Sequence, residues 1–336
     1  LALLYLFFLS IQLMQSSFKM FGSGFADSLI QATTNPLVGL CIGILATSMI
    51  QSSSTTTSIL VGLVAGGGMS IGNAIPIVMG ANIGTTVTCA IVAIAHVTRS
   101  REFERAYAAA SVHDFFNLLS VLVLLPLEVA TGVIERSSIA LTELFVGVGG
   151  FKAVNPVKAV VGPAAHLVKG LVLSFFDKGS LAASIMLLAI ALALLALALK
   201  YLSGTIRQVI TGKVERLVNG YLFSRPLRAL VLGALVTALV QSSSVTTSLV
   251  VPMVAGGIFT LDKVFPFMLG SNIGTTITAI LASMVTGSPA AITVALAHLT
   301  FNCCGTVIWY PLRWVPITLA KKLAYLAVNY KSIALA

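Results

Sequence analysis

The segment Gln51–Ser58 (QSSSTTTS) recurs almost unchanged as Gln241–Ser248 (QSSSVTTS). Each copy is a block of uncharged hydroxyl and amide groups that lies between apolar segments. Such a block is costly to place in a lipid-facing helix, because polar groups in hydrocarbon need hydrogen-bond partners. Two copies at matching places in one chain predict a polar site at the interface of an internal repeat.

The composition is that of a membrane protein with several spans. Of 336 residues, 57% are hydrophobic and 9% are charged, whereas a soluble domain has roughly 25% charged residues. Long apolar runs such as Ala182–Ala198 favour helices, because a membrane barrel has short alternating segments. Most Lys and Arg lie between apolar runs, so the net charge of +10 does not indicate nucleic-acid binding. We expect an all-α polytopic protein in a lipid bilayer, without a nucleic-acid partner.

The second half of the chain repeats the first at an offset of 190 residues, and later of 185. Gly80–Thr86 (GANIGTT) matches Gly270–Thr276 (GSNIGTT), and His113 matches His298. The matched histidines suggest a shared packing or hydrogen-bonding role. We divide the chain into an N-terminal span and interfacial segment (1–35), repeat 1 (36–128), a linker with one transmembrane span (129–223), repeat 2 (224–312) and an interfacial C-terminal tail (313–336).

The apolar segments beside each polar block are too short to span a bilayer alone. Pro36–Ile50 has 15 residues, or about 22 Å of helix against a hydrocarbon core of about 30 Å. We expect a re-entrant helical hairpin with the block near its tip; the alternative is a span broken at the block. Gly80–Thr86 and its copy predict an unwound stretch in a broken transmembrane helix, because glycine and Asn-Thr pairs disfavour regular helix.

The two repeats are expected to be inverted relative to each other. If the linker contributes only Leu181–Leu202, and each repeat has a hairpin and two spans, three crossings separate Gln51 from Gln241. An odd number of crossings gives inversion and an even number gives a parallel arrangement. Lys and Arg lie in both sets of loops, so they do not indicate the orientation.

The repeated blocks suit an anion and a cation that bind together. None of the four blocks contains Lys, Arg, Asp or Glu. Hydroxyls and the N–H groups at helix starts donate to an oxyanion, and amide, hydroxyl and carbonyl oxygens coordinate a small hard cation such as Na⁺. An anion held without cationic side chains needs a co-bound cation, and each ligand then favours the other. The pattern predicts a cation-coupled anion symporter; the alternative is that the small residues serve close helix packing.

The candidate ligands follow from these blocks. The candidate anion ligands are Gln51, Ser52, Ser53, Ser54, Gln241, Ser242, Ser243 and Ser244. The candidate Na⁺ ligands of the other two blocks are Asn82, Thr85, Thr86, Ser271, Asn272, Thr275 and Thr276. Asp114 is the only acidic residue well inside a predicted span, and its role is either functional or a structural pairing.

The paired Gln-Ser-Ser-Ser and Asn-Ile-Gly-Thr-Thr blocks, together with Val112–Asn117 (VHDFFN), resemble the type II sodium-dependent phosphate cotransporters of the sodium–phosphate symporter family. The resemblance implies Na⁺-driven uptake of inorganic phosphate by alternating access, with two inverted repeats and no organic cofactor. It also implies that the serines of both blocks surround phosphate. By the same resemblance, the residues that help bind Na⁺ are Ser271, Thr275 and Thr278, with Asn117 at a further Na⁺ site.

Two departures from the family pattern refine these expectations. Arg99 stands where electrogenic relatives have Asp, so we expect electroneutral transport or fewer Na⁺ ions. The linker has neither Cys nor a glycosylation sequon, which favours a bacterial inner-membrane protein. The alternatives are a Na⁺-coupled carrier of another oxyanion such as sulfate, an anion channel, and an intramembrane serine hydrolase. We expect a transporter and not an enzyme, because the serine blocks lack a Gly-x-Ser-x-Gly elbow. The oligomeric state is not predicted.

Overall fold

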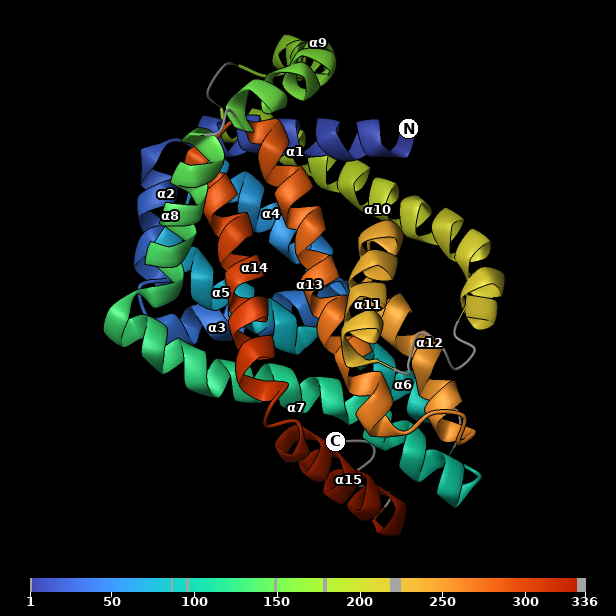
Figure 1. Cartoon of the computed structure of the whole chain (residues 1–336). Coiled ribbons are helices and arrows are strands. Elements are labelled where there is room, and N and C mark those ends of the chain that lie inside the picture. The colour runs from blue at the N-terminus through green and yellow to red at the C-terminus, as the bar shows by residue number, and fades with distance from the viewer. Residues whose placement is uncertain are drawn as a thin grey trace.

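A computed structural model describes residues 2–85, 87–94, 97–147, 150–177, 180–217 and 225–330, and no strand occurs in these ranges. The expected all-α fold is confirmed. The helices are α1 (Ala2–Phe21), α2 (Ser23–Ala32), α3 (Pro36–Ile50), α4 (Ser53–Ala65), α5 (Ile71–Gly84), α6 (Val87–Ile94), α7 (Ser100–Thr131), α8 (Val133–Gly147), α9 (Gly150–Phe175), α10 (Leu181–Leu217), α11 (Pro226–Val240), α12 (Ser243–Ala255), α13 (Leu261–Thr286), α14 (Pro289–Trp309) and α15 (Trp314–Asn329). Figure 1 shows their arrangement.

Five helical segments in the described ranges are long and apolar enough to cross a membrane: α7, Lys158–Phe175 of α9, Leu181–Leu202 of α10, α13 and α14. α2 and α3 would pass together as a sixth, but they are bent by 101°. The chain is therefore a multi-pass membrane protein, as expected. α1, which we expected to span, is not among these segments. The linker contains two candidates where we predicted one, so the crossing count no longer favours inversion, which stays a prediction.

The first repeat begins with a helical hairpin. α3 and α5 lie side by side and run in the same direction, because Gly39 near the start of α3 lies against Pro76, and Gly84 at the end of α5 lies against Thr47. α4 leads from the end of α3 back to the start of α5, so α4 runs antiparallel to both. This connection supports a hairpin rather than a span broken at the polar block.

The second repeat has the same arrangement. Gly233 of α11 lies against Phe267 of α13, and Gly274 lies against Thr237, so α11 and α13 also run in the same direction. α12 returns the chain between these two parallel helices. Both polar blocks thus lie at hairpin turns, one between α3 and α4 and one between α11 and α12.

The unwound stretch predicted at Gly270–Thr276 is wrong, and in the stretch predicted at Gly80–Thr86 the helix is interrupted only after Gly84. α5 is helical through Gly84, and α13 is continuous from Leu261 to Thr286. These glycines serve close packing of helices: a Cβ at Gly80 would lie 2.1 Å from the Leu40 carbonyl oxygen, and one at Gly270 only 1.9 Å from that of Leu230. A helix break lies within the motif in the first half only, where α5 ends at Gly84 and α6 begins at Val87.

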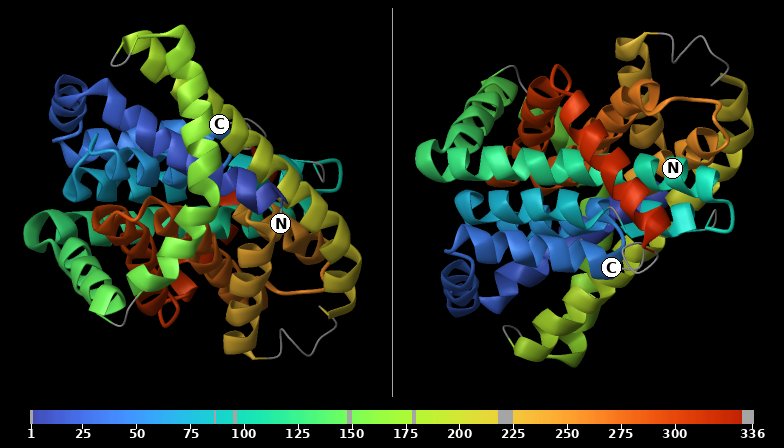
Figure 2. Two further views of the ribbon diagram at one scale, coloured as in Figure 1. Left: turned by 90° about the horizontal axis from the view of Figure 1, so that it is seen from above. Right: turned by 90° about the horizontal axis from the view of Figure 1, so that it is seen from below.

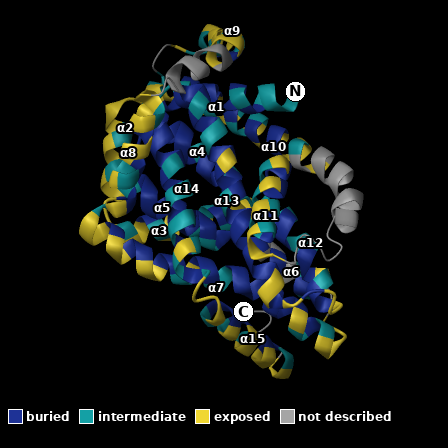
Figure 3. Ribbon diagram, viewed as in Figure 1, coloured by how far each residue is buried: buried dark blue, intermediate teal, exposed yellow. Residues whose placement is uncertain are grey.

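The core lies around α4 and α12, the inner arms of the two hairpins. α4 packs in one apolar cluster with α1, α10, α13 and α14, while α12 packs in another with α6, α7, α13 and α15. Figure 3 shows the buried residues concentrated on these central helices and the exposed ones on α2, α8 and α15. The outer arms α3 and α11 carry exposed apolar side chains such as Leu45 and Leu235, as expected of lipid-facing surfaces.

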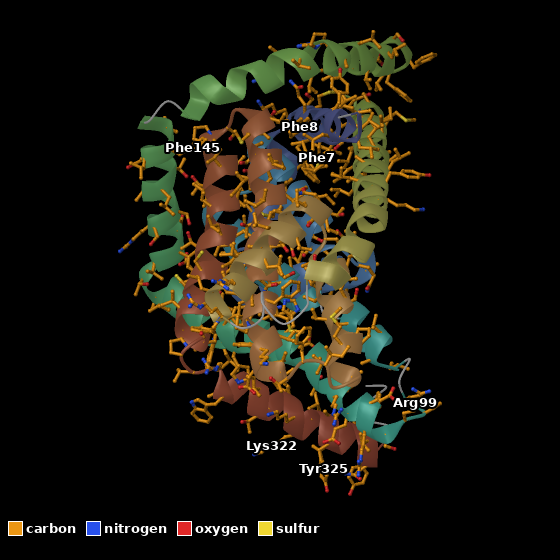
Figure 4. All side chains as sticks on the ribbon, turned by 45° about the vertical axis from the view of Figure 1, so that its right-hand side comes forward. Phe7, Phe8, Arg99, Phe145, Lys322 and Tyr325 are labelled. Carbon is orange, nitrogen blue, oxygen red and sulfur yellow. The ribbon has the colours of Figure 1, made fainter. Side chains whose placement is uncertain are left out.

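The remaining helices enclose this centre. α15 packs along α7, α8 along α14, and α1 along α10, and the two further views in Figure 2 show the same neighbours. Figure 4 places Arg99, Lys322 and Tyr325 at one end of the molecule and Phe145, Phe7 and Phe8 near the other.

Candidate functional site

The two hairpin turns share an unusual backbone conformation. Gln51 ends α3 with φ 58°, and Gln241 ends α11 with φ 59°. They are the only non-glycine residues with positive φ in the described part of the chain. The left-handed conformation costs a residue with a side chain roughly 1–2 kcal/mol. Strain kept at both matching positions is typical of a functional site.

Each turn is followed at once by the start of a buried helix. Ser52 caps α4 by accepting a hydrogen bond from the Thr55 N–H group (3.2 Å), and Ser242 caps α12 by accepting one from that of Val245 (3.3 Å). The first N–H groups of a helix have no acceptor in their own helix and carry its partial positive charge. The chain therefore presents two helix starts, each lined with serine hydroxyls.

The two turns meet in the interior. The Ser54 hydroxyl donates to the Gln241 carbonyl oxygen at 3.3 Å, although the two residues are 187 positions apart. Ser53 and Ser54 are buried in the first hairpin, as are Ser243 and Ser244 in the second. The structure thus brings the two predicted anion blocks together, while Gln51 stays exposed at the edge.

A threonine before each turn takes a different partner in the two halves. Thr47 donates to the Thr56 hydroxyl across the first hairpin (3.0 Å), whereas Thr237 donates to the Ser271 hydroxyl on α13 (2.8 Å). The matching position of Ser271 in the first half is Ala81, which has no hydroxyl. Neither threonine was predicted from the sequence, although their repetition four residues before each Gln was an available signal.

The threonines of the second pair of blocks have oxygens suited to a cation. Thr85, Thr275 and Thr276 donate their hydroxyl hydrogens to backbone carbonyls of the same helix, at 3.0, 3.0 and 2.7 Å. A hydroxyl oxygen that has donated its hydrogen keeps lone pairs for a cation. Thr278 is buried, and its hydroxyl has no hydrogen-bond partner among the described residues. Thr86 lies outside the described residues.

The three asparagines proposed as Na⁺ ligands lie in one chain of hydrogen bonds. Asn272 donates to the side-chain oxygen of Asn117 (2.7 Å). The side-chain N–H₂ group of Asn117 in turn donates to the backbone oxygen of Asn82 (3.0 Å). His113 contacts the side-chain oxygen of Asn272 at 2.6 Å. His298 contacts that of Asn82 at 3.4 Å. The hydrogen-bonding role expected for the matched histidines is confirmed for His113, whereas the contact of His298 is long.

The donor set is one of oxygens rather than classical metal ligands. In the part of the chain that the structure describes, no three His, Cys, Asp or Glu side chains are grouped to hold a metal ion. The hydroxyl, amide and carbonyl oxygens gathered here are ligands of hard cations. Cys89, which is buried in the core, lies 3.0 Å from the Thr247 hydroxyl on α12 and so contacts the second polar block.

A cavity of about 680 Å³ lies away from these blocks, beside the turn between α12 and α13. Its charged lining residues are Arg101, Arg105, Lys321, Glu104 and Asp262. The cations are largely offset by the two carboxylates, and none of the repeated polar residues lines this cavity. The candidate site is therefore assigned to the two hairpin turns and not to this cavity.

Comparison with known proteins places these features in a family context. Residues 6–153 and 194–310 match the Na⁺/Pi-cotransporter family. The chain is 34% identical over 408 residues to sodium-dependent phosphate transport protein 2A of Ovis aries, and 33% identical over 433 residues to protein 2B of Homo sapiens. These alignments cover 99% of this chain but only 64% and 62% of the two relatives. No solved structure matches the chain significantly.

Proposed function

Since this chain belongs to the Na⁺/Pi-cotransporter family, we propose that it couples Na⁺ influx to the uptake of inorganic phosphate. Membership in this family makes it a transporter and not an enzyme. Its relatives are named sodium-dependent phosphate transport proteins, and this chain spans about 64% of the sheep protein. The observation that carries the proposal is the contact of the two polar turns through Ser54 and Gln241.

Phosphate is proposed to bind where the two turns meet. The starts of α4 and α12 supply backbone N–H groups, and Ser53 and Ser243 supply buried hydroxyls beside them. Oxyanions bind at helix starts because the N–H groups point at them and the helix dipole favours negative charge. Ser52, Ser54, Ser242, Ser244 and the two glutamines complete the proposed phosphate ligands.

Na⁺ is proposed to bind at the neighbouring hydroxyl and amide oxygens and to be the coupling ion. Ser271 links the second hairpin to α13 through Thr237, so a cation at Ser271, Thr275 and Thr278 would lie next to the phosphate ligands. Because the four blocks contain no charged side chain, Na⁺ would neutralise part of the phosphate charge. Each ligand then raises the affinity for the other. The remaining proposed Na⁺ ligands are Asn82, Thr85, Thr86, Asn117, Asn272 and Thr276.

Transport is proposed to be electroneutral or to use fewer Na⁺ ions than electrogenic members of the family use. Arg99 takes the place of an aspartate in those members. Its guanidinium lies 3.0 Å from the Glu102 carboxylate in the first turn of α7, and its side chain is mostly exposed. The side chain is thus held at the surface and adds no cation ligand. A phosphate-induced current in proteoliposomes at clamped voltage, with net positive charge per phosphate, would contradict electroneutral transport.

The proposed function is tested by uptake of labelled phosphate into proteoliposomes. An inward Na⁺ gradient should concentrate phosphate inside the vesicles, while an equal K⁺ gradient should not. An anion channel would only equilibrate phosphate, and a serine hydrolase would give no uptake. Sulfate that competes as strongly as phosphate would favour a carrier of another oxyanion. The bacterial inner membrane stays a prediction, as do the inverted repeats.

A further inference from the structure

Six buried side chains join the two repeats where α7 and α14 pass α5 and α13. They are His113, Asn117 and Asn82 of repeat 1, and His298, Asn302 and Asn272 of repeat 2. On α7 and on α14 the histidine and asparagine are four residues apart, so they lie on one face of the helix. The contacts are reciprocal, since each histidine reaches the asparagine of the other repeat's motif. Reciprocal contacts of this kind are those of a two-fold relation between similar units.

The contacts of His113 form a tight arm whose donors and acceptors are determined. The backbone oxygen of Asn82 can only accept, so Asn117 donates to it through Nδ2 and turns Oδ1 towards Asn272. Asn272 then donates through its Nδ2 at 2.7 Å and turns its own Oδ1 towards His113. Because an amide oxygen accepts, the His113 Nε2 must carry the hydrogen in the 2.6 Å contact.

The contacts of His298 form a loose arm. Asn82 donates through Nδ2 to the Val78 carbonyl oxygen of its own helix (3.0 Å) instead of to Asn302. The distance between His298 Nε2 and Asn82 Oδ1 is 3.4 Å, beyond the usual range for an N–H···O bond. Asn302 donates to the His298 carbonyl oxygen at 3.1 Å. Its buried Oδ1 has no hydrogen-bond partner in the described ranges of the chain.

We propose that His113 and His298 are positioning residues of a two-state switch, in which the tight and loose arms exchange between the two repeats. In the opposite state, Asn82 would leave Val78 and donate to Asn302, and His298 would close on Asn82. In the same step Asn272 would stop donating to Asn117 and would donate instead to the carbonyl oxygen of Met268, which matches Val78 in the repeat. This inference rests on the proposed function, because the two states are those in which the transport site opens to opposite sides.

The exchange is balanced in hydrogen bonds. Each state keeps one complete arm, and each leaves one asparagine oxygen without a partner, that of Asn302 in one and that of Asn117 in the other. An unpaired buried acceptor is costly, but the cost is the same on both sides, so the two states stay close in free energy. The turns agree with this asymmetry, since Gln51 is exposed while Gln241 is buried. The opposite state should reverse these exposures.

Paired substitutions test the switch in the purified, ligand-free protein. His113→Leu removes the tight arm and should shift the protein towards the opposite state. His298→Leu removes a donor that the opposite state needs, and should shift it the other way. Hydrogen–deuterium exchange, followed in peptides over the two turns, should change in opposite directions in the two variants. Loss of one hydrogen bond predicts about a fivefold change in the ratio of the two turns' exchange rates.

Matched variants separate a switch from a static brace. His113→Gln and His298→Gln keep an N–H donor and should restore most of each shift. Asn302→Ala removes the acceptor of the opposite state and should act like His298→Leu, which keeps the test available if a histidine variant fails to fold. Equal shifts in the same direction, or none in folded variants, would overturn the proposal. Opposite shifts without Na⁺-driven uptake would instead contradict the proposed function and leave the switch standing.

Discussion

The hairpin α3–α4 and the hairpin α11–α12 have the same turn geometry and different surroundings. Gln51 and Gln241 have φ values of 58° and 59°, and each precedes a serine that caps the next helix. Yet Gln51 is exposed, whereas Gln241 is 8% exposed. The helix after the first hairpin ends at Gly84, while its counterpart continues to Thr286.

One further difference arises where the two repeats do not match. Thr237 bonds to Ser271, whereas Thr47 bonds to Thr56, because Ala81 offers no hydroxyl at the position of Ser271. Matched residues therefore produce the shared local geometry, and unmatched residues add a fixed difference between the halves. A transporter built from two similar halves needs both, since similar halves allow two related states and unmatched contacts set their balance.

The largest expected effect tests a feature that both halves share, the close packing of α3 on α5 and of α11 on α13 at glycine residues. Gly43→Ala and Gly233→Ala should both prevent stable folding, because the new Cβ would lie 2.1 Å from the Ile77 carbonyl oxygen and 2.0 Å from that of Phe267. We expect a loss of about 3 kcal/mol or more. Thermal unfolding of the purified protein measures it, with Gly170→Ala as control because no atom lies within 4 Å of the Cβ there. A parent-like melting temperature in either variant would show that the helices can separate.

The second prediction concerns the glutamines at the turns. Gln51→Gly and Gln241→Gly should leave stability within about 1 kcal/mol, because glycine adopts the left-handed conformation freely. The initial rate of phosphate uptake should fall about tenfold in Gln241→Gly and less in Gln51→Gly, since loss of a buried hydrogen-bonding group costs more. The exposed Gln31→Ala on α2 is the control. Equal losses at the two turns would mean that their different exposure has no functional consequence.

The third prediction concerns Ser271 and Ala81, which occupy matching positions of the two repeats but differ in residue type. Ser271→Ala should raise the KM for Na⁺ about tenfold, because the variant loses a proposed ligand and the partner of Thr237. The KM for phosphate at saturating Na⁺ should hardly change. Ala81→Ser, the reverse exchange in the first half, should leave the KM for Na⁺ within about twofold, since repeat 1 has no such hydroxyl to lose. Uptake at varied Na⁺ measures both; a changed phosphate KM in Ser271→Ala would instead place Ser271 at the anion.

The smallest expected effect is at Cys89. Cys89→Ala removes the contact with Thr247, and alanine already occupies the matching position, Ala279, in repeat 2. We expect a loss of less than about 1 kcal/mol and unchanged uptake, because a thiol is a weak hydrogen-bonding group. Thermal unfolding and uptake rates check this. Lost uptake in a stable Cys89→Ala protein would make the contact part of the transport site.

The hairpins could be predicted from the sequence because segment length is a local property. Arms of about 15 residues cannot span the hydrocarbon core, and Gln51–Ser58 and its copy supplied the polar turns. The helical state of Gly80–Gly84 and of Gly270–Thr276 could not be predicted in this way, because glycine either frees the backbone or allows another helix to pack closely. One signal favoured packing: Gly39–Gly43 and Gly80–Gly84 both have the pattern Gly-x-x-x-Gly.

The candidate site was predictable in its residues and less so in its pairings. Repetition identified the four blocks, and the structure brings Ser54 and Gln241 together. The pairing of His113 with Asn272 depends on how α7 crosses α13, which no local pattern specifies. Thr47 and Thr237 were missed because a single threonine in an apolar helix is common.

Equilibrium binding of labelled phosphate to the purified protein, titrated with Na⁺ and separately with K⁺, tests the joint site most directly. We predict that phosphate affinity rises with Na⁺ concentration, that Na⁺ affinity rises by the same factor with phosphate, and that Ser53→Ala or Ser243→Ala weakens phosphate binding about tenfold in the folded protein. The exposed Ser28→Ala, whose hydroxyl bonds only within α2, should bind like the parent. Phosphate affinity that is equal in Na⁺ and K⁺, and unchanged in both buried serine variants, would contradict the account.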